Sequence, residues 1–150
     1  MLAAFLQLPY EILIPNTLFE DELLRFTDDE KKLLRSSMKI MDLPGNSVIR
    51  AQQVVRALPR LSIHDGFAFA LAEANPGCIL LTGDGGLREL ADKHDMTVHG
   101  VLWVVDEIHA NALVTVDEIL AALSLFAGDS TVRLPRRLLL AAITRYESGI

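Results

Sequence analysis

The chain has 150 residues, of which 51% are hydrophobic and 23% charged, and its formal net charge is −6. This length suits one domain with a buried core, and the composition is that of a globular chain rather than a disordered one. The negative charge argues against a protein that coats nucleic acid non-specifically, because such binding depends on neutralising phosphates. It does not exclude a nuclease, whose acidic site first recruits metal cations.

The cysteine content and the apolar runs bound the cellular setting. The chain has one cysteine, Cys78, so a disulfide framework within the chain is impossible and a reducing, cytoplasmic location is expected. No apolar run approaches the roughly 18 residues that a membrane span needs. The first residues lack the basic region of a signal peptide, so no membrane association is expected.

Apolar spacing and turn residues predict helices and strands in alternation. The first part of the chain is predicted to form a helix at 2–8, a strand at 11–14, helices at 17–26 and 28–39, a short strand or turn at 41–45 and a helix at 46–57. The middle part is predicted to form a helix at 62–74, a strand at 78–82, a helix at 87–94 and a strand at 96–100. Three helices are predicted in the tail, at 101–112, 114–127 and 134–148. This order predicts an α/β fold with parallel strands.

Several helix starts carry residues that favour capping. Such side chains accept hydrogen bonds from the first backbone N–H groups of a helix. The predicted caps are Thr17 with Glu20, Asn46 or Ser47, and Ser62 with Asp65.

Two aspartates flank the most apolar part of the sequence. Asp84 follows the strand at 78–82 among glycines, and Asp65 lies in the first turn of the helix at 62–74. Taken singly, a turn aspartate and a cap are the ordinary interpretations. The helix leads directly into the strand and runs antiparallel to it, so the start of the helix and the end of the strand share one edge of the sheet. Ligands of parallel sheets bind beyond this carboxyl edge, where Thr82 adds a hydroxyl.

A third acid is expected from the helix at 17–26. Glu22 flanks its apolar stripe, whereas Glu20 and Asp21 lie more to the solvent side. Carboxylates and a hydroxyl suit Mg²⁺ or Mn²⁺, which bind phosphates and activate water. His64, beside Asp65, is a candidate for orienting substrate, and an exposed histidine is the ordinary alternative.

At residues 61–100 the chain resembles the second half of a PIN domain, of the branch found in prokaryotic toxin–antitoxin nucleases. The shared features are an Asp that opens an Ala-rich helix, the LLT-x-D block, Leu-Arg-x-Leu-Ala and V-x-G. Residues 11–23, EILIPNTLFEDEL, resemble the second strand of the family and the helix that carries its acid. The resemblance spans roughly residues 5–105, and the tail 106–150 resembles the helical extension of some members.

The resemblance implies a three-layer α/β/α fold with a parallel central sheet, and an Mg²⁺- or Mn²⁺-dependent endoribonuclease of the toxin type. Metal-held water would attack the phosphodiester. Asp65 and Asp84 would be metal ligands, Thr82 would support the site, and Glu22 would be the helix acid, with Glu20 or Asp21 as alternatives. The implied partners are an RNA substrate, an antitoxin protein and a second copy in a homodimer.

The sequence also departs from the family in one respect. The family opens with a strand that ends in Asp-Thr/Ser-Asn and supplies a first metal ligand, and no segment of this sequence supplies that motif. The expected sheet therefore lacks its usual first strand. The alternative function is a catalytically inactive PIN-like domain that binds a partner protein. A further alternative is a small α/β binding module in which both aspartates are structural.

Overall fold

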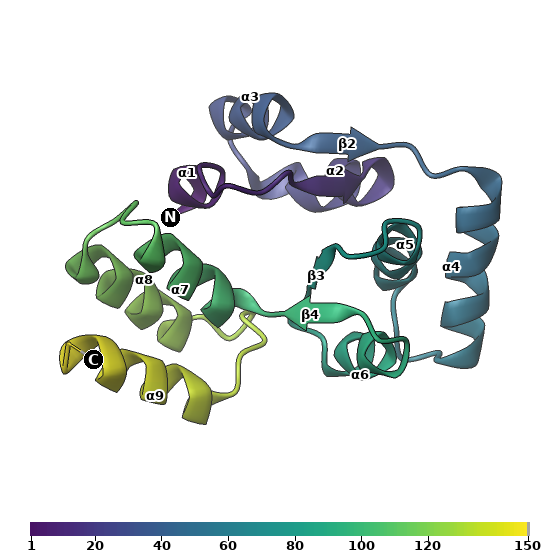
Figure 1. Ribbon diagram of the computed structural model, residues 1–150. Helices are drawn as coiled ribbons and strands as arrows, with labels where there is room; N and C mark the ends of the chain where they lie inside the picture. Colours follow the sequence, from purple (N-terminus) through teal and green to yellow (C-terminus); the bar gives the residue numbers. More distant parts are fainter. Residues whose placement is uncertain (150) are drawn as a thin grey trace. The chain divides into compact units, whose positions relative to one another are not determined.

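The computed structural model describes residues 1–149, which form two compact units. One unit spans Tyr10–Val98, and the other combines Met1–Pro9 with the chain from His99 onward. Helices alternate with short strands along the first unit, while helices alone follow the last strand (Figure 1). The predicted mixed α/β class is thereby confirmed.

The unit Tyr10–Val98 carries most of the strands. Its strands are β1 (Leu13–Pro15), β2 (Lys39–Met41) and β3 (Ile79–Leu81). A fourth strand, β4 (Thr97–His99), begins in this unit, and its last residue belongs to the other unit. The helices of the unit Tyr10–Val98 are α2 (Asn16–Glu22), which continues as the 3₁₀ turn η1 (Leu23–Arg25), then α3 (Asp28–Ser37), α4 (Gly45–Ala57), α5 (Ile63–Glu73) and α6 (Gly85–Lys93).

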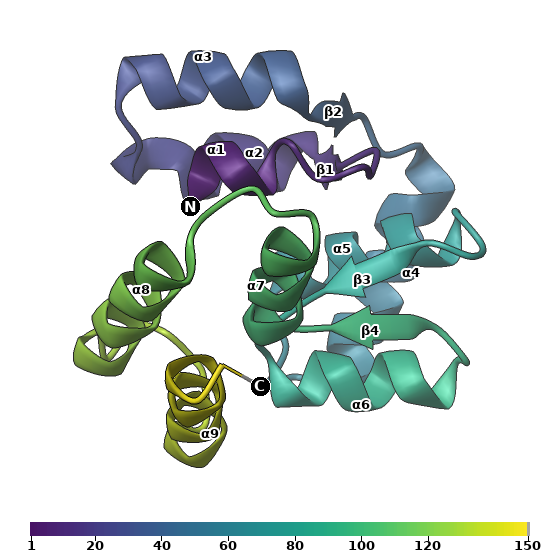
Figure 2. The ribbon, with the colours of Figure 1, turned by 60° about the vertical axis from the view of Figure 1, so that its left-hand side comes forward.

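The strands form two separate pairs. β1 pairs with β2 in parallel, with Ile14 opposite Ile40, and β3 pairs with β4. The arrows of β3 and β4 also point the same way in Figure 2. Within the described residues no strand joins the two pairs into one sheet. Helix α5 contacts both β1 and β3, so this helix, rather than a shared strand, connects the two pairs.

The core of this unit lies around α5. Phe69 on α5 has no exposed surface, and it clusters with Leu80 of β3 and with Leu87 and Ala91 of α6. Helix α5 also packs against α4, and there Gly66 is essential, because a Cβ at this position would lie 2.8 Å from the Ala51 carbonyl oxygen. This close contact sets the position of α5 against α4, and therefore the position of the first turn of α5.

The second unit is helical. It contains α1 (Leu2–Phe5), α7 (Val101–Ala110), α8 (Val116–Gly128) and α9 (Arg136–Glu147), so the three predicted tail helices are present. Helix α8 packs against α9, and α7 contacts both α1 and α8. Inside, the Tyr146 hydroxyl donates to Asp106 Oδ1 at 2.6 Å, and burial together with this carboxylate raises the pKa of Tyr146 to about 12. Arg145 also pairs with Asp106.

The single tryptophan of the chain lies at the start of α7. The rings of His99 and Trp103 are stacked, with 4.5 Å between their centroids and 7° between their planes. Both side chains are partly buried. The stack therefore holds the indole in a fixed orientation within the second unit.

Some local predictions were wrong. The helix predicted at 2–8 is the four-residue α1, and Lys39, predicted to end a helix, belongs to β2, where its N–H donates to the Ile12 carbonyl. Helices α2 and α4 begin after Pro15 and Pro44 without a side-chain cap, so the caps predicted at 17–20 and 46–47 are absent. Proline fixes φ near −65°, and here Pro15 and Pro44 occupy the N-cap positions in place of a polar capping residue.

None of the helices that the structure describes is both long enough and apolar enough to cross a bilayer.

Candidate functional site

Asp65 is held at the start of α5 by a reciprocal capping box. Its backbone N–H donates to Ser62 Oγ at 3.1 Å, while its Oδ2 accepts from the Ser62 N–H and the Ser62 hydroxyl, each at 2.8 Å. The predicted cap is therefore confirmed. These bonds engage only one carboxylate oxygen of a partly buried side chain.

Asp84 begins the next helix. It is the N-cap of α6, and its Oδ1 accepts from the Leu87 N–H at 2.9 Å. The hydroxyl of Thr82 accepts from the Asp84 N–H at 3.0 Å, so Thr82 orders the turn between β3 and α6. Both carboxylates thus lie at the positive ends of helices.

The starts of α5 and α6 lie close together, and Arg60 lies between them. This residue stands two positions before Ser62, and its guanidinium covers Gly86, two positions after Asp84. A Cβ added at Gly86 would lie 2.8 Å from Arg60 Nε and 3.2 Å from Asp84 Oδ1. Helices α5 and α6 are also in direct contact. The beginnings of the two helices that carry Asp65 and Asp84 therefore form one local surface.

His64 connects this surface to α2. Its Nε2 lies 3.2 Å from Asp21 Oδ2, and its buried Nδ1 has no hydrogen-bond partner among the residues described. Of the other two acids of α2, Glu20 pairs with Arg35 on α3 at 3.5 Å, and Glu22 is exposed near the end of the helix. The structure therefore gives Asp21, rather than Glu20 or Glu22, a contact with the first turn of α5.

Within residues 1–149, no three His, Cys, Asp or Glu side chains are grouped so that they could hold a metal ion. Asp65 and Asp84 remain as carboxylates at adjoining helix starts, so a cation there would need further oxygen ligands from water or from a substrate.

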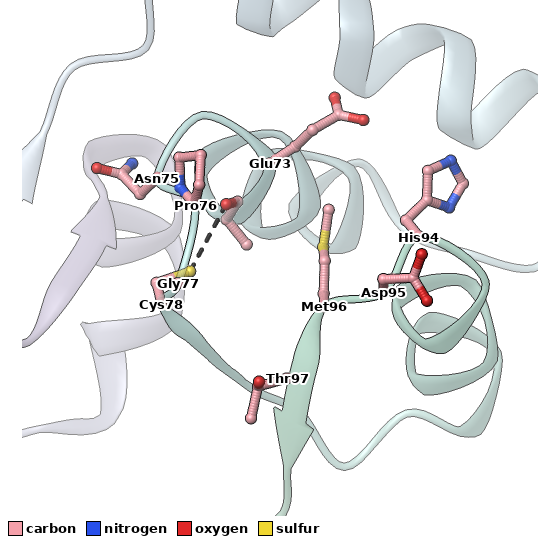
Figure 3. Close-up of a pocket in the computed structure, with 10 residues that line it drawn as sticks. Glu73, Asn75, Pro76, Gly77, Cys78, His94, Asp95, Met96 and Thr97 are labelled. Atoms are coloured by element: carbon pink, nitrogen blue, oxygen red, sulfur yellow. Dashed lines mark hydrogen bonds between the residues drawn. The ribbon is translucent and has the colours of Figure 1, made fainter.

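A separate pocket opens at the amino ends of β3 and β4, where Cys78 and Met96 precede the strands (Figure 3). Its volume is about 290 Å³. Two of the polar groups that line it have partners: Cys78 Sγ donates to the Ala72 carbonyl at 3.6 Å, and Glu73 accepts two bonds from Arg50, at 2.8 and 3.0 Å. Burial raises the pKa of the Cys78 thiol, which makes it a poor nucleophile.

Sequence reasoning missed Arg60 and the pairing of His64 with Asp21. Position 60 precedes a predicted cap in a turn, and nothing in its spacing shows that the side chain crosses to the next helix. The only signal is the glycine pair 85–86, which hints that something approaches the start of α6 closely.

Comparison with known proteins identifies the family. A family described as a PIN domain matches residues 1–148, and the chain belongs to this family. No curated protein matches the chain, and no solved structure matches it. Proteins with a PIN domain have a nuclease-type fold, and PIN domains generally use divalent metal ions.

Proposed function

We propose that the chain is an Mg²⁺- or Mn²⁺-dependent endoribonuclease that hydrolyses RNA phosphodiester bonds. One observation carries the proposal: in a PIN-domain chain, Asp65 and Asp84 head two helices whose starts adjoin through Arg60 and Gly86. This is the arrangement expected of two carboxylates that serve one site.

The donor set is compatible with such an ion. Mg²⁺ is commonly held by one or two carboxylates, with water and substrate phosphates completing its shell. Asp65 and Asp84 would be the direct ligands, and Glu22, or Asp21 beside it, would bind through water. The ion would supply an activated water and stabilise the leaving oxygen.

The chain's own residues have positioning roles in this proposal. Ser62 and the Leu87 N–H each hold one oxygen of a carboxylate, which fixes its rotamer before any ligand arrives. Thr82 holds the Asp84 backbone, and Asp21 holds His64 beside Asp65, where the imidazole is proposed to orient the RNA. Such preorganisation lowers the cost of assembling the site.

The proposed setting follows the family branch that the sequence resembles. The chain would act in the cytoplasm as the toxin of a toxin–antitoxin pair. An antitoxin protein would be its partner, and two copies of the chain would form a homodimer.

Cleavage of single-stranded RNA in Mn²⁺ tests the proposal. Asp84→Asn and Asp65→Asn keep a side chain that can cap a helix, so both variants should fold. We expect each to lower the cleavage rate by at least about 100-fold, since even residues that merely support metal ligands cost 10–100-fold. Asp95→Asn is the matched control, because Asp95 has a φ of 55°, which Asn also tolerates, at the other end of the strands. Equal rates for wild type and Asp84→Asn, or no metal-dependent cleavage by either, would refute the proposal.

A second candidate function is an inactive PIN-like module that binds a protein. It is favoured by the absence, within the described residues, of three grouped metal-binding side chains. Tight Mn²⁺ binding in calorimetry, abolished by Asp84→Asn, would count against it.

A further inference from the structure

Arg60 lies against the start of α6, although its side chain is 63% exposed. Its Nε and Cζ are 2.8 and 3.3 Å from the point that a Gly86 Cβ would occupy. The glycine therefore leaves the space into which the guanidinium fits. Asp84 Oδ1 is 3.2 Å from the same point, so the cation and the proposed metal ligand flank one glycine.

The guanidinium retains capacity for a further ligand. Its NH2 group donates to Glu89 at 3.3 Å, and the side chains of Arg60 and Glu89 are 63% and 57% exposed. Exposed ion pairs of this kind are weak, because water and salt screen them, so an incoming anion can replace Glu89. A guanidinium carries five N–H donors in a planar fork, a geometry that matches a phosphate.

We propose that Arg60 is a substrate-binding residue that holds a phosphate of single-stranded RNA beside Asp84. The proposal rests on the proposed nuclease function and adds a specific contact to it. On a chain with a net charge of −6, a cation placed beside Asp84 gives the RNA backbone a local positive charge to bind. The contact is to the phosphate, so it should not discriminate among bases.

Two neighbouring glycines provide a matched pair of variants. A Cβ at Gly86 would collide with the Arg60 guanidinium, whereas a Cβ at Gly85 would meet no atom within 4 Å. Gly86→Ala should therefore displace Arg60 without removing its charge, while Gly85→Ala should leave it in place. Neither glycine has a positive φ, so alanine is compatible with the backbone at both positions.

The decisive measurement is RNA affinity as a function of salt concentration, with EDTA present so that binding is separated from cleavage. We expect Arg60→Ala to weaken binding roughly tenfold at low salt, as for the loss of one charged hydrogen-bonding contact. The slope of log K against log salt should become shallower by about 0.7, the value for one phosphate on a single strand. Arg60→Lys should keep the slope, because the charge remains, but lose part of the affinity.

The controls are Arg56→Ala, which removes an exposed arginine from the last turn of α4, and Gly85→Ala. Both should bind RNA like wild type, and Gly86→Ala should bind more weakly. In cleavage assays Arg60→Ala should raise KM and change kcat little, as expected for uniform binding.

Unchanged affinity and slope in Arg60→Ala, or a loss of the same size in Arg56→Ala, would overturn the inference. Failure of the wild-type chain to bind single-stranded RNA at low salt would overturn it as well. If the Arg60-dependent slope appears but no variant cleaves RNA in Mn²⁺, the nuclease proposal fails and the phosphate contact stands.

Discussion

At the residue scale, Asp65 and Asp84 each have a structural role that a metal ligand could retain. One carboxylate oxygen of Asp65 accepts a hydrogen bond from the Ser62 N–H, and one of Asp84 accepts from the Leu87 N–H. A cap alone contributes about 1 kcal/mol. Stability measurements alone therefore cannot distinguish a capping aspartate from a ligand, whereas metal binding can.

The capping contribution itself can be measured at Ser62. Ser62→Ala should lower the free energy of unfolding by about 1 kcal/mol, because the Asp65 N–H loses its acceptor. Urea denaturation measures this change. Ser124→Ala is the control, since Ser124 donates to the Leu120 carbonyl within α8 and caps nothing. An equal loss in both variants would contradict the capping role.

A second residue-scale feature is the Arg50–Glu73 ion pair. The side-chain hydrogen bond from Arg50 lowers the pKa of Glu73 below its usual value, with the attraction between the charges adding to this effect. A carboxyl group whose pKa is lowered by folding stabilises the folded state above the pKa of the unfolded chain. This contribution is lost as the pH falls through the lower, folded-state pKa.

Glu73→Gln should therefore destabilise the chain near neutral pH and have little effect in strong acid. About a third of each side chain is exposed, so solvent screening limits the loss to about 1 kcal/mol or less. Urea titrations of wild type and variant at pH 7 and pH 3 measure the difference. A gap between the two proteins that is the same at both pH values would show that Glu73 acts through packing instead.

At the element scale, α5 organises the unit Tyr10–Val98. It contacts both strand pairs and α2, α4 and α6, and its first turn carries His64 and Asp65. Helix α5 therefore lies between Asp21 of α2, which it contacts through His64, and α6, which it contacts directly.

The packing of α5 on α4 gives a prediction at this scale. Gly66→Ala places a methyl group 2.8 Å from the Ala51 carbonyl oxygen, so the two helices must separate. We expect a loss of about 1–3 kcal/mol, the usual cost of overpacking. Gly85→Ala, which meets open space, should be neutral or slightly stabilising. Thermal unfolding of both variants measures the effect, and a stable Gly66→Ala protein would show that α4 can shift freely.

The sequence was informative about elements where the local signals agreed. Ser62 with Asp65 marked the start of α5 correctly, and the apolar run at 78–82 gave β3. The predicted caps of α2 and α4 were wrong, because a proline rather than a polar residue precedes each helix. The position of Arg60 could not be foreseen either, because the path of a long side chain depends on tertiary packing.

At the scale of the whole molecule, the family match covers nearly the full chain, while the described strands remain in two pairs. The parallel pairing of β1 with β2 was predictable from the helices between them, since parallel strands need a crossover. The sequence predicted an α/β core followed by a helical tail from residue 106, but not a boundary after Val98 or the inclusion of Met1–Pro9 in the helical unit. Such a boundary depends on which residues pack together, and a continuous strand can cross it.

The stacked pair of His99 and Trp103 has a practical consequence. As the only tryptophan, Trp103 is the sole source of indole fluorescence, and its fixed orientation should also give a near-ultraviolet dichroism signal. Both signals arise from the start of α7. Spectroscopists therefore have an intrinsic optical reporter for the helical unit, which needs no label and no added chromophore.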